Sequence, residues 1–157
     1  MPRNNSDVRH VNAVNAVIMP EIVALINGGH TVTLRLRGVS MRPYLEDGRD
    51  SALLAKPKPP RIGDPVLAIV PPGRYVLHRI VAIDGDDITL LGDGNLTCEH
   101  CTTADIQASV VGFYRKGRTR LEPTDGRRWR VYSKLWMTLR PVRRYLLAAY
   151  RRLWRKN

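Results

Sequence analysis

The spacing of apolar and polar positions changes from helical to strand-like near residue 30. Between residues 11 and 27, valine, isoleucine and leucine recur at steps of three and four, which predicts a short helix. We expect Pro20 to split this helix or to open its second half, and Gly28-Gly29 to end it. In residues 31–38 (TVTLRLRG), apolar residues alternate with threonine and arginine, which is the period of a half-buried strand.

The middle of the chain reads as a series of short strands. Apolar runs over residues 51–55, 65–70 and 74–84 predict strands, and stretches rich in proline and glycine separate them. The turn Gly85-Asp86 leads into DITLLGD, which predicts a β-hairpin, and ASVVGFYR (residues 108–115) predicts a last strand. We therefore expect a β-domain over residues 31–116, preceded by a helical segment over residues 1–30.

The helical period returns at Trp129. From there to Leu153, apolar and aromatic residues recur at steps of three and four, with arginine and lysine between them. This pattern predicts a strongly amphipathic basic helix, or two helices separated at Pro141. Residues 117–157 thus form a third segment, a basic amphipathic helical tail on a mainly β protein.

The charge is concentrated in this tail. The chain has a net charge of +12; residues 1–114 hold 11 Lys/Arg against 12 Asp/Glu, and residues 115–157 hold 15 against 2. A near-neutral body followed by a basic tail predicts a body that performs chemistry and a tail that meets an anionic surface. The stripe that contains Trp129, Trp136 and Trp154 favours a membrane face, or packing on the β-domain or a partner such as an exporter. Nucleic acid is less favoured, because no nucleic-acid reader motif accompanies the charge.

Several protein classes do not fit the sequence. The two cysteines, Cys98 and Cys101, are too few for a disulfide framework, and with no second ligand pair they predict ordinary thiols in a loop, without a metal or cofactor. No stretch approaches the roughly 18 apolar residues of a membrane-spanning helix. Residues 1–21 have no apolar run long enough for a secretory signal, because polar residues and Pro20 interrupt them, so we expect none. We expect a cytoplasmic protein, at most peripheral at the inner face of the membrane.

Three blocks carry candidate chemistry: GVSMRPYLEDGRD (residues 38–50), YVLHRIVAIDGD (residues 75–86) and LLGDGN (residues 90–95). In this order and spacing, over about residues 32–115, the chain resembles the signal peptidase I family. The resemblance implies the signal-peptidase/LexA-like β-fold with Ser40 as nucleophile. It implies His78 as general base, as in the archaeal and endoplasmic-reticulum members, and Asp93 as the acidic partner.

Chemistry supports these roles independently. A serine hydroxyl is a poor nucleophile until a base takes its proton, and imidazole, with a pKa near 6.5, does this at neutral pH without special tuning. A carboxylate such as Asp93 can fix the histidine tautomer and stabilise the imidazolium. We expect Arg79 to pair with Asp93 or Asp64 and to support the site. Each residue also has a structural alternative: Ser40 could simply stabilise a turn, His78 could be a hydrogen-bonded structural residue of a strand, and Asp93 could be a turn former.

The sequence predicts only one of the hydrogen-bond donors that an oxyanion site needs. Ser40 lies on a predicted turn, where its backbone N–H could face a developing oxyanion. Many family members have a second serine two residues before the nucleophile, and here Gly38 occupies that position. The second donor is then a backbone group or is missing. Met41 and Pro43 are expected to be structural or to line the substrate groove.

The predicted function is hydrolysis of a signal or leader peptide by a serine endopeptidase, through an acyl-enzyme on Ser40. Because no membrane anchor is evident, we expect a cytoplasmic leader peptide as substrate, cut beside an exporter. A LexA-like self-cleaving repressor fits less well, since His78 replaces the usual lysine and residues 1–30 are too short for a DNA-binding domain. The other alternative is a non-catalytic module that binds an extended peptide at a strand edge, favoured by Gly38.

Overall fold

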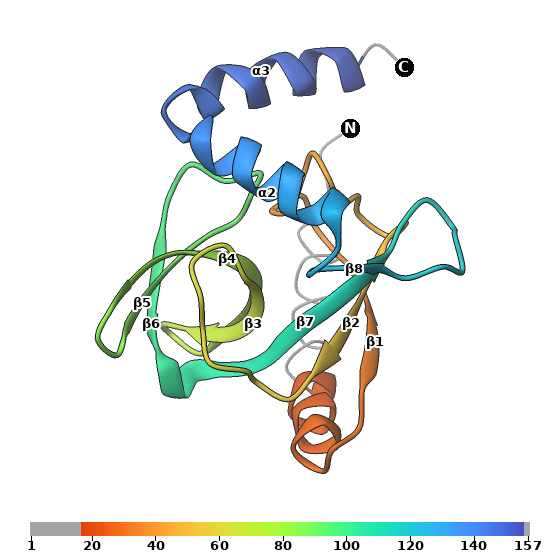
Figure 1. The fold of residues 1–157 in the computed structure, drawn as a ribbon, viewed down its shortest axis with the longest axis vertical. Coiled ribbons are helices and arrows are strands. Elements are labelled where there is room, and N and C mark those ends of the chain that lie inside the picture. Colours follow the sequence, from red (N-terminus) through yellow and green to blue (C-terminus); the bar gives the residue numbers. More distant parts are fainter. Residues whose placement is uncertain (1–16, 156–157) are drawn as a thin grey trace.

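A computed structural model describes residues 17–155, and it shows a strand-rich antiparallel sheet curled into a half-barrel (Figure 1). A short helix over residues 17–27 precedes the sheet, and two helices follow it. The strands are β1 (Val32–Arg35), β2 (Ser51–Ala55), β3 (Pro65–Val70), β4 (Arg74–Asp84), β5 (Asp87–Leu91), β6 (Glu99–Thr102), β7 (Ile106–Tyr114) and β8 (Glu122–Pro123). A 3₁₀ turn, η1 (Thr103–Asp105), connects β6 to β7.

The sheet curls because its strand pairing shifts at three places. The strand order is β1-β2-β7-β3-β4-β5-β6, and β8 pairs with β7. The register shifts between Leu53 and Leu54, between Leu67 and Ala68, and between Ile80 and Ala82. Such irregularities bend a strand and increase its twist. The third shift, in the β4–β5 pair, lies within the ring of strands visible in Figure 1.

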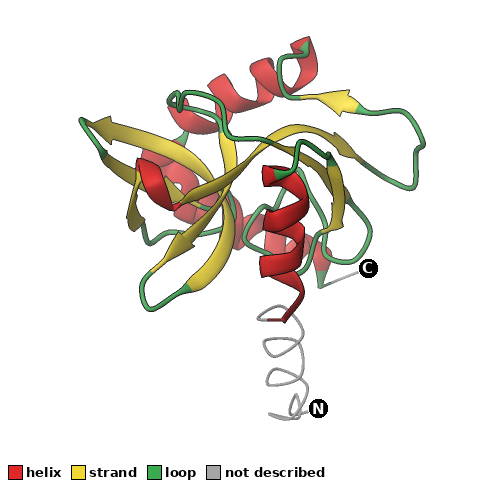
Figure 2. Ribbon diagram, turned by 90° about the horizontal axis from the view of Figure 1, so that it is seen from below, coloured by secondary structure: helices red, strands yellow, loops and turns green. Residues whose placement is uncertain are grey.

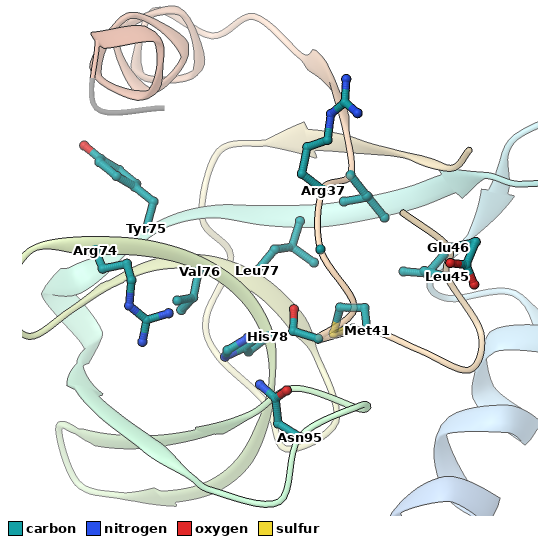
Figure 3. Close-up of a pocket in the computed structure, with 13 residues that line it drawn as sticks. Arg37, Met41, Leu45, Glu46, Arg74, Tyr75, Val76, Leu77, His78 and Asn95 are labelled. Atoms are coloured by element: carbon teal, nitrogen blue, oxygen red, sulfur yellow. The ribbon is translucent and has the colours of Figure 1, made fainter. Parts of the chain in front are cut away.

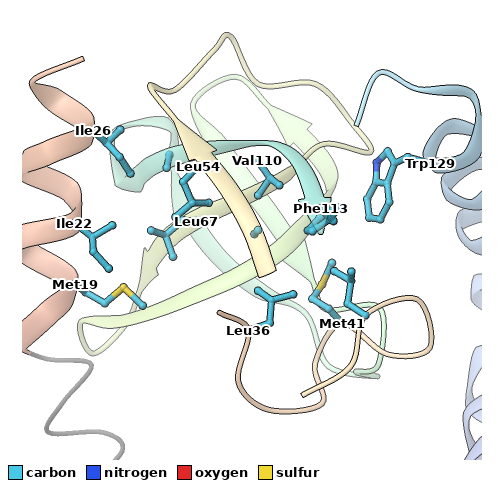
Figure 4. Close-up of a cluster of buried hydrophobic side chains, with 13 residues drawn as sticks. Met19, Ile22, Ile26, Leu36, Met41, Leu54, Leu67, Val110, Phe113 and Trp129 are labelled. Carbon is cyan, nitrogen blue, oxygen red and sulfur yellow. The ribbon is translucent and has the colours of Figure 1, made fainter. Parts of the chain in front are cut away.

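The curled sheet buries two hydrophobic cores. The first lies between the helix of residues 17–27 and the first of the two C-terminal helices, and it includes Ile22, Leu54, Phe113 and Trp129 (Figure 4). Figure 2 shows this helix lying against the sheet. The second core fills the ring of β3 to β6. Both cores contain apolar residues from the strands, which is the burial that the apolar runs in the sequence predict.

Most of the predicted elements are confirmed. The strands over residues 51–55, 65–70 and 74–84 have the predicted bounds, and the turn at Gly85-Asp86 closes the hairpin to β5. The last predicted strand begins two residues earlier, as β7. The strands β6 and β8 were not predicted, because each is short and rich in polar residues or proline.

The N-terminal helix differs from its prediction at Pro20. Helical structure runs through Pro20, so the expected break is not observed there. Met19 and Ile22, on either side of the proline, are buried in the first core while Pro20 is exposed, and this burial holds the helix together. Gly29, with φ of 91°, ends the helix as predicted. Residues 11–16 of the predicted helix lie outside the described residues.

The tail forms two helices separated at Pro141, which is the second of the two predicted arrangements. Helix α2 (Arg127–Thr138) and helix α3 (Arg143–Trp154) are separated by the 3₁₀ turn η2 (Arg140–Val142), which contains Pro141. Helix α2 packs on the sheet, and α3 is the layer farthest from it (Figure 1). Within residues 17–155, none of the helices has the length and apolarity that crossing a membrane requires.

We expect Trp129→Ala to destabilise the whole protein. The Trp129 side chain is 3% exposed, and its ring contacts those of Phe113 and Tyr44 at centroid distances of 4.9 and 5.2 Å. Its loss should lower the free energy of unfolding in urea by about 3–5 kcal/mol. Val131→Ala on the same helix, at a side chain 61% exposed, is the control and should change it by about 0.5 kcal/mol or less. Equal effects would mean that α2 is not part of the cooperative unit.

Candidate functional site

Three segments that are distant in the sequence meet at one cleft. They are the turn after β1, the first half of β4 and the loop between β5 and β6. The cleft has a volume of about 230 Å³, and Ser40, Met41, His78 and Asn95 are among its lining residues (Figure 3). Apolar and charged side chains both line it, so it can accept a ligand with both kinds of group.

The cleft runs along an unpaired edge of β4. Strand β3 pairs with β4 over residues 74–79, whereas β5 pairs with β4 only from Arg79 onward. Residues 74–78 therefore have one edge without a strand partner in the described part of the chain, and all five line the cleft. Backbone N–H and C=O groups at such an edge can pair with an extended peptide.

Ser40 is held by a close contact with the glycine-rich loop. It lies on the turn that follows β1, and the Gly94 N–H donates to its carbonyl oxygen at 2.8 Å. A Cβ atom at Gly94 would lie 2.3 Å from the Val39 oxygen, and one at Gly92 would lie 2.6 Å from the Ser40 oxygen. Both distances are shorter than any ordinary contact, so the Gly-Asp-Gly sequence is what allows the loop to press against the Ser40 turn.

His78 is buried beside a carboxylate. Its side chain is 4% exposed, and Nδ1 lies 2.9 Å from Oε2 of Glu99, an ion-pair distance without the alignment of a straight hydrogen bond. Glu99 also forms an ion pair with Arg74. Burial lowers the pKa of His78, and the charge of Glu99 opposes that shift. A neutral imidazole in this position can accept a proton at neutral pH.

Asp93 has different partners from those expected. Its two carboxylate oxygens accept from Nε and Nη2 of Arg79, each at 2.8 Å, and Oδ2 also accepts from the Tyr132 hydroxyl at 2.8 Å. None of its hydrogen bonds or ion pairs reaches His78. The expected His78–Asp93 pair is therefore replaced by His78–Glu99, because Arg79 and Tyr132 already occupy the Asp93 carboxylate.

Arg79 pairs with Asp93, the first of the two carboxylates expected for it, and not with Asp64. Both side chains of the pair are 0% exposed. Nη1 of Arg79 also donates to the Gly63 carbonyl at 3.1 Å and to the Ser133 hydroxyl at 2.6 Å. The guanidinium group further lies 4.7 Å from the centre of the Trp129 ring. The buried charge is thus surrounded by acceptors and aromatic faces, as a buried cation requires.

The residues expected around Ser40 have separate positions. Gly38 lines the cleft with φ of +85°, and its N–H donates to Asp47 at 2.9 Å, so this donor does not point freely into the cleft. Met41 is buried and lines the cleft, and Pro43 is half-buried and does not. Of the two expected groove residues, only Met41 borders the cleft.

The two cysteines are free thiols on either side of Glu99. Burial raises the pKa of Cys101 to about 11, which keeps it protonated at neutral pH. Nη2 of Arg140 donates to Sγ of Cys98 at 3.4 Å. Within residues 17–155, no three His, Cys, Asp or Glu side chains gather as metal ligands would.

Glu99 is the site residue that the sequence interpretation missed. Residues 98–101 were predicted as a loop, whereas Glu99 begins β6. Ile80 of β4 is opposite Leu90 of β5, which is opposite Glu99, so the three share one face with His78, two residues before Ile80. This register could have pointed to Glu99 only if β6 had been recognised as a strand.

Comparison of the sequence with protein-family models and with curated proteins found no match in either case.

We expect Asp93→Asn to destabilise the protein by about 3–5 kcal/mol, because it leaves the buried Arg79 guanidinium without a countercharge. The free energy of unfolding in urea measures the effect. Asp84→Asn removes an exposed carboxylate at the end of the same strand as Arg79, and it should change the value by about 0.5 kcal/mol or less. Equal stability of the two variants would contradict the buried ion pair.

Proposed function

We propose that the protein is a serine endopeptidase of the signal-peptidase type, which hydrolyses a leader or signal peptide. Ser40 is the nucleophile, His78 the general base, and Glu99 the carboxylate that orients His78. The observation that carries this proposal is the shared cleft: Ser40 and His78 both line it, and His78 has a carboxylate at Nδ1. The antiparallel half-barrel supports the further proposal that the fold is of the signal-peptidase/LexA-like type.

The proposed reaction proceeds through an acyl-enzyme. Oγ of Ser40 attacks the scissile carbonyl carbon while Nε2 of His78 takes its proton, and Glu99 stabilises the imidazolium. His78 then gives the proton to the leaving amine as the peptide bond breaks. A water molecule, deprotonated by His78, attacks the ester, and the proton returns to Ser40 as the acid product leaves.

The developing oxyanion needs donors other than Gly38. The Gly38 N–H already donates to Asp47. We assign the donors to the Ser40 backbone N–H and the Asn95 side-chain amide, which faces the cleft beside His78 in Figure 3. A side-chain amide can serve in this way, and removing such a donor typically lowers kcat by about 10²–10³-fold.

The proposed substrate is an extended peptide. The unpaired edge of residues 74–78 offers backbone groups for strand addition, and Leu36, Met41 and Leu45 offer an apolar wall for its side chains. Cleavage after small residues within a leader segment is what the family resemblance implies.

A second candidate function is a peptide-binding module without catalysis. It is favoured by one observation, the bond from the Gly38 N–H to Asp47, which occupies a donor close to the nucleophile. Such a module would use the same β4 edge and the same cleft, so peptide binding alone does not separate the two candidates.

Cleavage of a peptide library by the full chain tests the first candidate. We expect cleavage after small residues, and loss of at least about 10³-fold in kcat for Ser40→Ala and for His78→Ala. A fluorophosphonate probe should label the unmodified protein and not Ser40→Ala. Ser51→Ala, on β2 and outside the cleft, should behave as the unmodified protein does. Peptide binding without cleavage or labelling would favour the binding module.

Glu99→Gln should lower kcat by about 10²–10⁴-fold, because it removes the countercharge of the imidazolium. In the unmodified protein, the acid limb of kcat/KM should lie below the ordinary histidine value of about 6.5, since burial lowers the pKa of His78 and activity falls only when pH drops through that lowered pKa. The glutamine variant should move the limb to still lower pH, because the charge of Glu99 raises this pKa.

His100→Gln, at the exposed neighbouring position, is the matched control for the pH profile and should leave both kcat and the limb unchanged. An unchanged kcat in Glu99→Gln would remove Glu99 from the proposed mechanism.

A further inference from the structure

Helix α3 presents an unusual surface to solvent. Its buried residues are Arg143 and Leu147, and most of its other side chains point outward. Large apolar side chains are among them: Tyr145 is 64% exposed, Leu153 68% and Trp154 49%. Exposed aromatic and aliphatic residues gathered on one outer helix mark an interaction surface.

The same helix is basic: α3 holds four arginines and no Asp/Glu. The whole segment of residues 126–157 holds 11 Lys/Arg and no Asp/Glu. On α3 itself, Arg144, Arg151 and Arg152 are exposed alongside the apolar residues. Helix α2, beneath it, adds exposed basic residues at Arg127 and Arg130. The partner of this surface must therefore offer both negative charge and an apolar layer.

We propose that α3 docks on the face of an anionic lipid membrane and lies in the plane of the headgroups. Its tyrosine, leucine and tryptophan side chains enter the interface, and its arginines meet lipid phosphates. Nucleic acid would satisfy the arginines but gives no reason for exposed leucine side chains. This inference concerns a surface outside the cleft and does not depend on the proposed peptidase activity.

The docking surface adjoins the cleft. The guanidinium group of Arg42 lies 5.6 Å from the centre of the Trp154 ring, and Arg42 Nε donates to Glu46 at 2.9 Å. Glu46 lines the cleft, and Arg42 is two residues after Ser40. A membrane bound at α3 would thus lie beside the cleft, within reach of a peptide at the lipid surface.

Cosedimentation of the full chain with lipid vesicles tests the proposal. We expect binding to vesicles of equal parts phosphatidylcholine and phosphatidylglycerol, weakening as the salt concentration rises, and little binding to phosphatidylcholine alone. Tryptophan emission should shift to shorter wavelength on binding. Because Trp129 and Trp136 are already buried, the shift should come from Trp154, and Trp154→Phe should abolish the shift while the protein still sediments.

Charge reversal on α3 separates a specific surface from general attraction. Arg151→Glu/Arg152→Glu should weaken binding to anionic vesicles by about tenfold or more. Lys56→Glu/Lys58→Glu changes the net charge equally at exposed residues on the loop after β2, and it should have a much smaller effect. Leu153→Glu, at an exposed apolar position, should weaken binding as well.

Three results would overturn the proposal: equal binding to neutral vesicles, equal loss in the two double variants, or tighter binding to duplex DNA than to anionic vesicles at the same salt concentration. Ser40→Ala should bind vesicles as the unmodified protein does. Failure of the peptidase proposal therefore leaves this measurement intact, and the reverse also holds.

Discussion

The rest of the structure depends on the buried ion pair between Arg79 and Asp93. Both side chains are fully buried, and such a pair is stable only if the remaining donors and acceptors are satisfied. Helix α2 supplies two of these partners, the Tyr132 and Ser133 hydroxyls, and the Trp136 indole donates to the Asp93 carbonyl. The pair therefore joins β4, the loop before β6 and α2, and it explains why the first half of a basic tail belongs to the folded body.

The same pair fixes the geometry of the cleft. Asp93 lies between the two glycines whose backbone presses against the Ser40 turn, so holding Asp93 also holds that turn. Arg79 and His78 are neighbours in β4, and successive residues of a strand point to opposite faces. One strand thus directs a buried cation toward α2 and an imidazole toward the cleft. A shift of β4 by one residue would exchange the two.

The sequence predicted the parts of the fold that follow from local pattern. Strands with strong apolar character were found with their bounds, and Ser40 and His78, which are 38 residues apart in the sequence and were predicted as partners, line one cleft. The partner of His78 was not predictable in the same way. Glu99 reaches it through pairing across β4, β5 and β6, and β6 has four mostly polar residues that carry no strand signal. The structure also showed that Asp93 pairs with Arg79 and not with His78. The motif alone could not decide this, because it identifies a carboxylate but not which of two adjacent basic residues pairs with it.

The tail illustrates how one amphipathic pattern can serve two purposes. Pro141 divides it, and each half has its own apolar stripe. The stripe of α2 faces the ion pair and the first core, where its aromatic rings surround the Arg79 guanidinium. Helix α3 lies outside this layer, and only two of its residues, Arg143 and Leu147, are buried. The short η2 turn connects α3 to α2, and Tyr132 and Trp136 of α2 donate hydrogen bonds to Asp93, so α3 is linked to the loop that borders the cleft. In the proposed docking, a membrane bound at α3 would therefore set the orientation of the cleft as well as its location.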